Sequence, residues 1–222
     1  MMIAKLLAAI VTGYLLGSIP FGLIVSKLQS RVDIRNYGSG RTGGTNVLRT
    51  LGRKAFLMVA VGDIAKAALA VLLASLVVGD SYFAIGNYHM GRAAVQSIAG
   101  VAAIMGHIFP LFAHFKGGRG VATFIGGLAA LSPVAALFGG EILLVSAGLS
   151  GFASLGSIIG VVSAYAIMIP LTIIYGVPVE YLAYVLVGTL IIVVAHRDNI
   201  KRLLSGKERK LNQKATPTSS PA

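Results

Sequence analysis

Residues 55–78 read AFLMVAVGDIAKAALAVLLASLVV, an apolar run interrupted by one acid, Asp63, and one base, Lys66. A helix needs about 20 apolar residues to cross roughly 30 Å of hydrocarbon, so this run is long enough to span a membrane. Asp63 and Lys66 stand three residues apart and therefore share a helix face, where they can pair and make two buried charges tolerable. We interpret the two residues mainly as structural.

Two more apolar runs reach this length, residues 3–25 and 152–175. Four shorter runs are marginal as isolated spans but can cross a membrane inside a small bundle: residues 93–108, 121–131, 134–149 and 179–195. Glycine is abundant, with 28 residues, and its helical spacing favours close backbone approach at Gly148, Gly151, Gly156 and Gly160. The sequence predicts an all-α polytopic membrane protein of about seven transmembrane helices, with Gly-rich cytoplasmic loops.

The composition excludes several classes of protein. A hydrophobic content of 56%, a mean hydropathy of +0.84 and only 12% charged residues are not those of an ordinary soluble domain. Because the chain has no cysteine, it has no disulfide framework, no thiolate nucleophile and no cysteine-based metal site. We expect neither a metal nor an organic cofactor.

The positions of the basic residues predict the orientation. Most of the 19 Lys and Arg residues fall in residues 29–54, in residues 109–120 and in the segment after residue 195. Cytoplasmic loops carry an excess of Lys and Arg, so these segments belong inside and the N-terminus outside. We expect a single transmembrane domain over residues 1–200 and a basic cytoplasmic tail over residues 201–222, whose polar end from Gln213 is disordered.

The first basic loop contains NYGSGRTGGTNVLR, residues 36–49. Four glycines mixed with hydroxyl and amide side chains, and closed by Arg49, can aim backbone N–H groups at one anion. The segment is not a Walker A loop, because no Gly-Lys-Ser/Thr closes it and no strand precedes it. A flexible membrane loop whose arginines contact anionic lipid is the alternative.

The second basic segment reads GHIFPLFAHFKGGRGVAT, residues 106–123. Lys116 and Arg119 flank flexible glycines at the start of the next helix, where free N–H groups favour a phosphate. His107 and His114 more often make structural hydrogen bonds than transfer protons. The phenylalanines of this segment are typical of an aromatic belt at the headgroup level, and a nucleic-acid partner is not expected.

Polar residues elsewhere on the same side complete the candidate site. After the last apolar run, His196 and Asn199 share one face if the helix continues, although a purely polybasic membrane anchor is the alternative. Ser154 falls on the remaining inside turn, facing the same side as the Gly-rich loops. Glu141 is either a proton-relay carboxylate or an interfacial residue, and the sequence does not decide between them.

Together, the three motifs resemble the integral-membrane acyl-phosphate:glycerol-3-phosphate acyltransferases of bacterial phospholipid synthesis, and the resemblance covers nearly the whole chain. It implies an enzyme of the bacterial inner membrane that moves a fatty acyl group from acyl phosphate to the sn-1 hydroxyl of glycerol 3-phosphate. The products are lysophosphatidic acid and inorganic phosphate. The expected partners are therefore glycerol 3-phosphate, a fatty acyl phosphate and membrane lipid.

Carried over onto this sequence, the resemblance implies a polar site. Its residues are Ser39, Arg49, Lys116, Ser154, His196 and Asn199, with Thr45, Asn46, Gly117 and Gly118 lining the phosphate pocket. Of these, Ser39, Lys116, His196 and Asn199 are the implied catalytic residues. Arg41 and Gly44 depart from the Asn and Ala usual in the family, so the first loop can differ in geometry and donor preference.

The mechanism needs no covalent acyl-enzyme, because an acyl phosphate is already activated. Cations and backbone N–H groups can align two phosphate-bearing reactants, and alignment alone can supply roughly 7 to 11 kcal/mol of a barrier. The proton of the attacking hydroxyl goes either to a substrate phosphate or to His196 as general base. A membrane transporter of a phosphorylated solute is the alternative function, and it would spread polar residues through the depth of the membrane.

Overall fold

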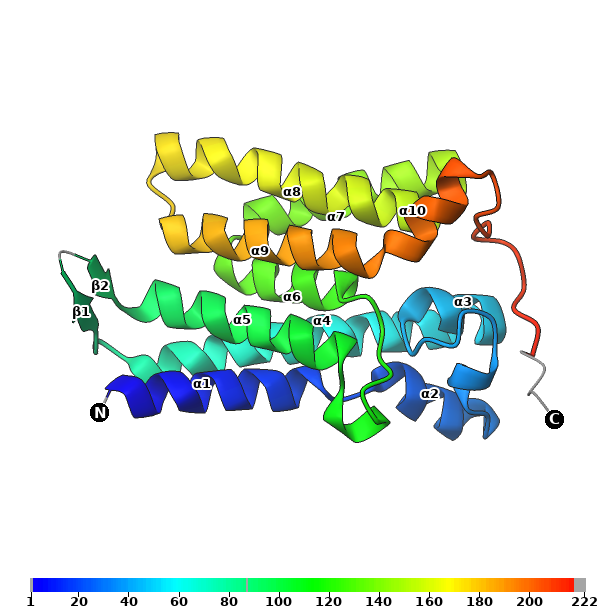
Figure 1. Ribbon diagram of the computed structural model, residues 1–222, viewed down its shortest axis with the longest axis horizontal. Helices are drawn as coiled ribbons and strands as arrows, with labels where there is room; N and C mark the ends of the chain where they lie inside the picture. The colour runs from blue at the N-terminus through cyan, green and yellow to red at the C-terminus, as the bar shows by residue number, and fades with distance from the viewer. Residues whose placement is uncertain (1, 87, 218–222) are drawn as a thin grey trace.

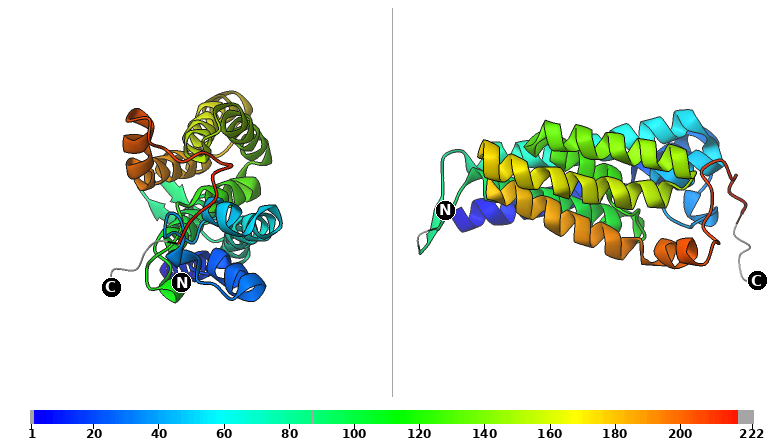
Figure 2. Two further views of the ribbon diagram at one scale, coloured as in Figure 1. Left: turned by 90° about the vertical axis from the view of Figure 1, so that its right-hand side faces the viewer. Right: turned by 90° about the horizontal axis from the view of Figure 1, so that it is seen from above.

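The computed structural model describes residues 2–86 and 88–217, and the long helices in this part of the chain lie side by side as one bundle (Figures 1 and 2). The long helices are α1 (Met2–Gly17), α4 (Arg53–Val78), α5 (Arg92–Ile108), α6 (Val121–Leu131), α7 (Pro133–Ser150), α8 (Ala153–Tyr175) and α9 (Val179–Ala195). Short helices at one end are α2 (Phe21–Ser30), η1 (Ile34–Asn36), α3 (Gly44–Leu51), η2 (Leu111–Ala113) and α10 (Arg197–Leu204). An antiparallel hairpin of β1 (Phe83–Ile85) and β2 (Tyr88–Met90) lies at the other end.

The membrane-spanning helices confirm the predicted fold class. Within the described residues, five helical segments are long and apolar enough to cross a membrane. A sixth candidate is α9 with α10, bent by 59° at His196, and α6 is a shorter apolar helix of 11 residues. The total agrees with a count of about seven, and α6 crosses the bundle only because its neighbours bury it on several sides.

The first span differs from the prediction of one run over residues 3–25. Helix α1 ends at Gly17, and α2 begins at Phe21 and continues to Ser30. The break falls at Pro20, which has no backbone N–H to donate and disfavours the helical conformation in the residue before it. The carbonyl groups around the break are therefore open to side chains from other helices.

Small residues bring the helices together. A Cβ atom on Gly13 or Gly17 would overlap the backbone of Ala99 or Ala103, so α1 packs directly on α5. Gly156 and Gly160 pack in the same way against α7. Close packing at these two glycines is as predicted, but Gly148 faces open space and Gly151 ends α7 with a φ of +75°. The predicted glycine stripe therefore serves three different purposes.

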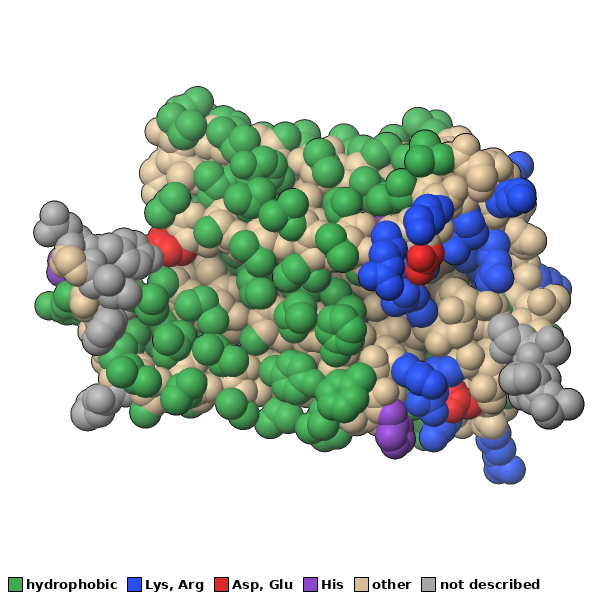
Figure 3. All heavy atoms as spheres, viewed as in Figure 1, with side chains coloured by type: hydrophobic (Ala, Val, Ile, Leu, Met, Phe, Trp, Pro, Cys, Tyr) green, Lys and Arg blue, Asp and Glu red, His purple; other side chains and the backbone are tan. Residues whose placement is uncertain are grey.

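The surface divides along the bundle axis. Large apolar side chains cover the body of the molecule, with Leu76, Leu149 and Ile173 each more than three quarters exposed (Figure 3). The Lys and Arg side chains visible in this view gather at the end that carries α2, α3 and α10. An exterior this apolar has no place in water, so the protein is a multi-pass integral membrane protein.

Candidate active site

A cavity of about 570 Å³ lies at the basic end and extends between α4, α6 and α7. Its polar wall comes from the first loop and α3, from the glycines before α6, and from His196 after α9. Its apolar wall is built by Phe56, Ala60, Ile64, Ile125, Leu143 and Leu144. The cavity therefore joins a cationic mouth to an apolar arm inside the span region.

Asn46 holds the first loop in shape. Its buried side-chain amide donates hydrogen bonds to the carbonyls of Ile34, Tyr37 and Arg41 at 2.9–3.1 Å, and its Oδ1 accepts from the backbone N–H of Ser39 at 3.1 Å. These bonds give Asn46 a role in positioning the loop. Asn46 also lines the cavity, and its predicted contact with substrate stays a prediction.

The loop that Asn46 organises faces the cavity. Ser39, Gly44 and Thr45 all lie on its wall, together with Arg41. Helix α3 starts at Gly44, so its first N–H groups point toward the same space. A flexible membrane loop was the alternative for this segment, whereas Gly44–Leu51 fold into a short helix.

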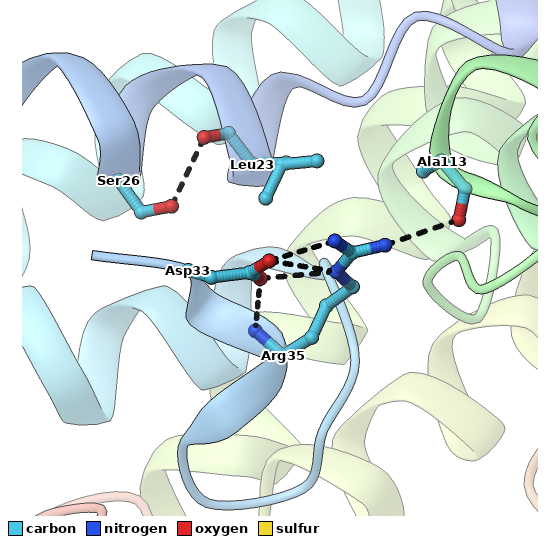
Figure 4. Close-up of polar contacts among 5 residues, drawn as sticks. All are labelled: Leu23, Ser26, Asp33, Arg35 and Ala113. Atoms are coloured by element: carbon cyan, nitrogen blue, oxygen red, sulfur yellow. Dashed lines mark hydrogen bonds and ion pairs between the residues drawn. The ribbon is translucent and has the colours of Figure 1, made fainter. Parts of the chain in front are cut away.

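Arg35 joins the first loop to the second basic segment (Figure 4). Its guanidinium forms an ion pair with Asp33 at 2.7 Å and reaches the carbonyl oxygen of Ala113 at 3.4 Å. The Asp33 carboxylate also accepts from the backbone N–H of Arg35 at 3.0 Å. The Arg35 hydrogen bonds lower the pKa of Asp33 against the opposing effect of burial. Two Gly-rich segments far apart in the sequence are held side by side by this contact.

The second segment places Arg119, and not Lys116, in the cavity wall. Arg119 lies beside Gly118 and Gly120 on the wall, and its Nε has no protein partner among the described residues. Burial, together with the neighbouring Arg41, lowers the pKa of Arg119 to about 10. Lys116 is exposed and lies outside the wall. The predicted role of Lys116 stays a prediction, and Arg119 is the cation that this segment brings to the cavity.

Gly117 and Gly118 are fixed by contact with His107. A Cβ atom on Gly117 would overlap the carbonyl oxygen of His107, and one on Gly118 would overlap its Nε2 atom. The N–H of Gly118 donates to the His107 carbonyl at 3.1 Å. Of the two, only Gly118 lines the cavity. Glycine is needed here because the segment runs directly over the end of α5.

Ser154 and Asn199 meet a side chain that the sequence analysis did not single out, Glu208. Ser154 Oγ and Asn199 Nδ2 donate to Glu208 Oε1 at 2.8 and 2.6 Å, and Arg202 Nε donates to Oε2 at 2.7 Å. Burial acts to raise the pKa of Glu208, but these hydrogen bonds outweigh it and lower the pKa. Neither Ser154 nor Asn199 lines the cavity, and their predicted place at the substrate site stays a prediction.

The tail continues from Glu208 across the mouth of the cavity. Arg49, which lines the cavity, donates from Nε and Nη2 to the carbonyls of Lys210 and Arg209 at 3.1 and 2.7 Å. Burial lowers the pKa of Arg49. Beyond Gln213, Ala215 and Thr216 form backbone hydrogen bonds to Arg49 and Gly38. The predicted disorder of the tail end stays a prediction, and residues 218–222 lie outside the described residues.

His196 lies at the bend between α9 and α10 and lines the cavity. Its Nδ1 is 2.8 Å from the carbonyl of Ile192, which fixes the proton on Nδ1 and leaves Nε2 as an acceptor. Burial and the nearby Arg119 lower the pKa of His196 to about 4. The imidazole is therefore neutral near pH 7 and can accept a hydrogen bond from a hydroxyl.

Comparison with known proteins assigns the chain to a family. Residues 7–206 match the family model for glycerol-3-phosphate acyltransferase. The chain is 61% identical to glycerol-3-phosphate acyltransferase 3 of Dehalococcoides mccartyi strain CBDB1, over 97% of this chain and 100% of that one. It is 39% identical to the glycerol-3-phosphate acyltransferase of Halalkalibacterium halodurans, over 94% of this chain and 97% of that one. The chain belongs to the glycerol-3-phosphate acyltransferase family.

Solved structures of the family agree with the fold. A crystal structure of PlsY (YgiH), an integral membrane glycerol 3-phosphate acyltransferase in its glycerol 3-phosphate form, is 38% identical and superposes with a TM-score of 0.79. The match covers 92% of this chain and 94% of that chain. The lysophosphatidic acid form gives a TM-score of 0.78 at 37% identity. The family model ends at Gly206, so Glu208 and the tail that contacts Arg49 lie beyond it.

The remaining charged residues of the spans have different positions. Asp63 and Lys66 pair at 2.8 Å, as the sequence predicted, but Asp63 and His107 also line the cavity. Glu141 is exposed and lies outside the cavity wall. The motifs alone do not reveal the contacts that place four residues of this acyltransferase family member at the site: Asp63, His107, Arg119 and Glu208.

Proposed function

We propose that this protein transfers a fatty acyl group from acyl phosphate to the sn-1 hydroxyl of glycerol 3-phosphate. The observation that carries the proposal is a single cavity that joins an arginine-rich mouth to an apolar arm between α4, α6 and α7. The reaction joins two reactants that both carry phosphate, one of which also carries an alkyl chain. The mouth suits the phosphates, and the apolar arm suits the chain.

Phosphate binding in this proposal uses fixed cations and backbone N–H groups. Arg119 has an unpaired Nε, and within the described chain Arg49 donates from Nε and Nη2 and leaves Nη1 for a ligand. The N–H groups that begin α3 and α6 add the partial positive charge of two helix ends. Bringing an anion to these partly buried cations relieves the repulsion between Arg41, Arg49 and Arg119, so the charge of the site favours binding.

The acyl transfer needs no nucleophile from the protein. The hydroxyl oxygen of glycerol 3-phosphate attacks the acyl carbon, the carbon–oxygen bond to phosphate breaks, and inorganic phosphate leaves with the bonding pair. The leaving phosphate can take the hydroxyl proton. His196 Nε2 can accept a hydrogen bond from the hydroxyl and orient it, but an imidazole with a lowered pKa holds a proton weakly. Arg119 and the glycine N–H groups stabilise the departing charge.

In this proposal the chemistry takes place on the cytoplasmic side. Basic side chains gather at the end with the cavity mouth, and cytoplasmic loops carry the excess of Lys and Arg. Location in the bacterial inner membrane follows from the same proposal. In the described part of the chain the polar wall of the cavity lies at one end of the bundle, which supports an enzyme over a solute transporter, since a transporter would spread polar residues through the depth of the membrane.

The experiment is acyl transfer by detergent-purified protein. Palmitoyl phosphate and palmitoyl-CoA are compared as donors, with and without glycerol 3-phosphate, and the regiochemistry of the product is determined. We expect lysophosphatidic acid acylated at sn-1, and free phosphate, from palmitoyl phosphate alone. Arg119→Gln should raise the KM for a phosphate substrate by about ten- to a hundredfold, the usual cost of one charge-assisted hydrogen bond. Lys116→Ala is measured alongside it, because the predicted catalytic role of Lys116 stays a prediction, and Lys54→Ala, an exposed lysine outside the cavity wall, is the control. No product from either donor in folded protein would refute the proposal.

A further inference from the structure

A buried polar cluster lies beneath the mouth of the cavity, between α4 and α5. The ammonium of Lys66 is 2.8 Å from Asp63 Oδ1, 3.0 Å from His107 Nδ1 and 2.8 Å from the carbonyl oxygen of Ile19. The Phe21 ring lies 5.9 Å from the same nitrogen. The side chains of Asp63, Lys66 and His107 are each less than a tenth exposed. The Pro20 break in the first span therefore supplies one hydrogen-bond acceptor of this cluster, the carbonyl oxygen of Ile19.

The cluster fixes the tautomer of His107. A lysine ammonium has three donors and no acceptor, and the Lys66 nitrogen lies within 3.0 Å of Asp63 Oδ1, the Ile19 carbonyl oxygen and Nδ1 of His107. Nδ1 also lies 3.3 Å from Asp63 Oδ1, but the Lys66 nitrogen is nearer and can only donate, so the geometry points to Nδ1 as the acceptor and to a neutral imidazole with its proton on Nε2. A doubly protonated His107 would instead turn an N–H toward the Lys66 cation. His107 is thus the opposite tautomer to His196, whose proton lies on Nδ1.

The Nε2–H group of His107 lies at the cavity. His107 and Gly118 are both on the cavity wall, and the position that a Gly118 Cβ would occupy overlaps Nε2. Among the described residues, the hydrogen-bond and ion-pair contacts of the His107 ring are made by Nδ1, which lies 3.0 Å from Lys66 Nζ and 3.3 Å from Asp63 Oδ1. A donor on a cavity wall that makes no hydrogen bond to the protein is available to a ligand.

We propose that Asp63 and Lys66 hold His107 so that its Nε2–H donates a hydrogen bond to a phosphate oxygen of the substrate. The inference rests on the proposed acyltransferase function and adds a binding residue, His107, and two positioning residues. Phosphate oxygen is the acceptor because the same space is bordered by Arg119 and by the start of α6. Glycerol 3-phosphate and acyl phosphate both present such an oxygen, and the kinetics distinguish them.

A purely structural role does not explain the arrangement. A buried ion pair is weak evidence for stability, because apolar residues of similar volume often serve as well. Here the pair is joined to a histidine, and the histidine contacts both glycines of the mouth segment. Each of these features follows if the cluster presents one N–H group to a ligand.

The first test replaces His107 and measures both substrates. His107→Leu removes the donor, and we expect the KM for one phosphate substrate to rise by about tenfold, with a smaller change in kcat. His107→Gln places an amide N–H near the former Nε2 position, and we expect it to recover most of that loss. The rise in KM for glycerol 3-phosphate or for acyl phosphate identifies the source of the oxygen. Unchanged KM values in His107→Leu, or a Gln variant no better than Leu, would overturn the proposal.

His114→Asn is the matched control. His114 lies in the same segment, is exposed, and has a positive φ of 55°, which asparagine tolerates. The paired substitution Asp63→Leu with Lys66→Met removes both charges and leaves no buried charge unpaired. If the cluster is only structural, this double variant keeps its KM; if the cluster positions His107, the KM rises even in protein that unfolds at the wild-type temperature.

A spectroscopic measurement can be made on the wild-type protein, and a variant is needed only to assign the His107 resonances. In protein with ¹⁵N-labelled histidine, His107 should show the Nε2–H tautomer, and its Nε2 resonance should shift when glycerol 3-phosphate or inorganic phosphate is added. A His107 with its proton on Nδ1, or one that does not respond to either anion, refutes the inference. This readout also separates the two proposals: without acyl transfer by the wild type the proposed function fails, whereas the hydrogen bond to phosphate is still decided.

Discussion

Acyl-chain selection should depend on two glycines of α7. Gly140 and Gly148 both line the cavity, and a Cβ atom at either would meet nothing within 4 Å. Neither has a positive φ, so a larger residue fits the helix without backbone strain. Gly148 lies near the mouth, and Gly140 lies eight residues back along the helix, about 12 Å deeper at 1.5 Å per residue. The two positions therefore sample different depths of the apolar arm.

A leucine at Gly140 should shorten the arm. Its side chain fills space equal to about three methylenes of an acyl chain, and each buried methylene is worth about 0.8 kcal/mol, so a long donor loses about 2.4 kcal/mol, or about 50-fold in kcat/KM. A donor too short to reach that depth loses nothing. Gly148→Leu lies near the mouth, so it should reduce kcat/KM for donors of every length.

The assay measures kcat/KM for a series of acyl phosphates, from octanoyl to stearoyl, with the two variants and the wild type. Thermal unfolding provides the control for folding, and both variants should be at least as stable as the wild type because leucine is the better helix former. The reasoning is refuted if Gly140→Leu reduces short and long donors equally, or if it leaves the length profile unchanged.

Three further substitutions probe the polar wall. Gly118→Ala should displace the segment over His107 and reduce activity by at least tenfold, on the order of one lost charge-assisted hydrogen bond. Gly43→Ala is the control: its added Cβ would lie an ordinary 3.7 Å from Gly118, so activity in the same kinetic assay should hardly change. Asn46→Ala leaves three carbonyls without their donor and should lower the free energy of unfolding by about 2–4 kcal/mol, measured by chemical denaturation. Glu208→Gln should free the tail for tryptic cleavage. In the wild type the tail is docked above the ordinary carboxyl pKa, and docking is lost as the pH falls through the lowered pKa of Glu208, so tryptic cleavage should rise only in acid. Equal cleavage at all pH values would contradict this.

The spans and the common side of the motifs could be predicted because both depend on local properties of the sequence. Hydropathy over 20 residues is a local quantity, and the alternation of loops follows once the spans are counted. The break at Pro20 was visible in the sequence, but a run that is apolar on both sides of a proline does not reveal whether the helix bends or stops. The sequence therefore predicted one span over residues 3–25, where the structure has two helices.

Side-chain direction was the part that could not be predicted. Lys116 and Arg119 are three residues apart in a segment without regular structure, so nothing in their spacing says which one faces inward. Glu208 approaches Ser154 and Asn199 only because the tail turns back after α10, and such a return depends on contacts between distant parts of the chain. A lone acid in a basic tail was the one available signal that Glu208 has a special partner.

The charge distribution explains why the site combines buried cations with no nucleophile. Partial burial and the neighbouring arginines lower the pKa of Arg119 to about 10. Holding a charged guanidinium there, partly removed from water, therefore reduces the stability of the empty site. An anion that enters the cavity recovers this cost, and the recovery is largest when charge concentrates on the leaving phosphate. Polar groups fixed before the reaction need no rearrangement as that charge develops. A cavity of this kind favours phosphate departure by electrostatics alone, which is what an activated acyl donor requires of its enzyme.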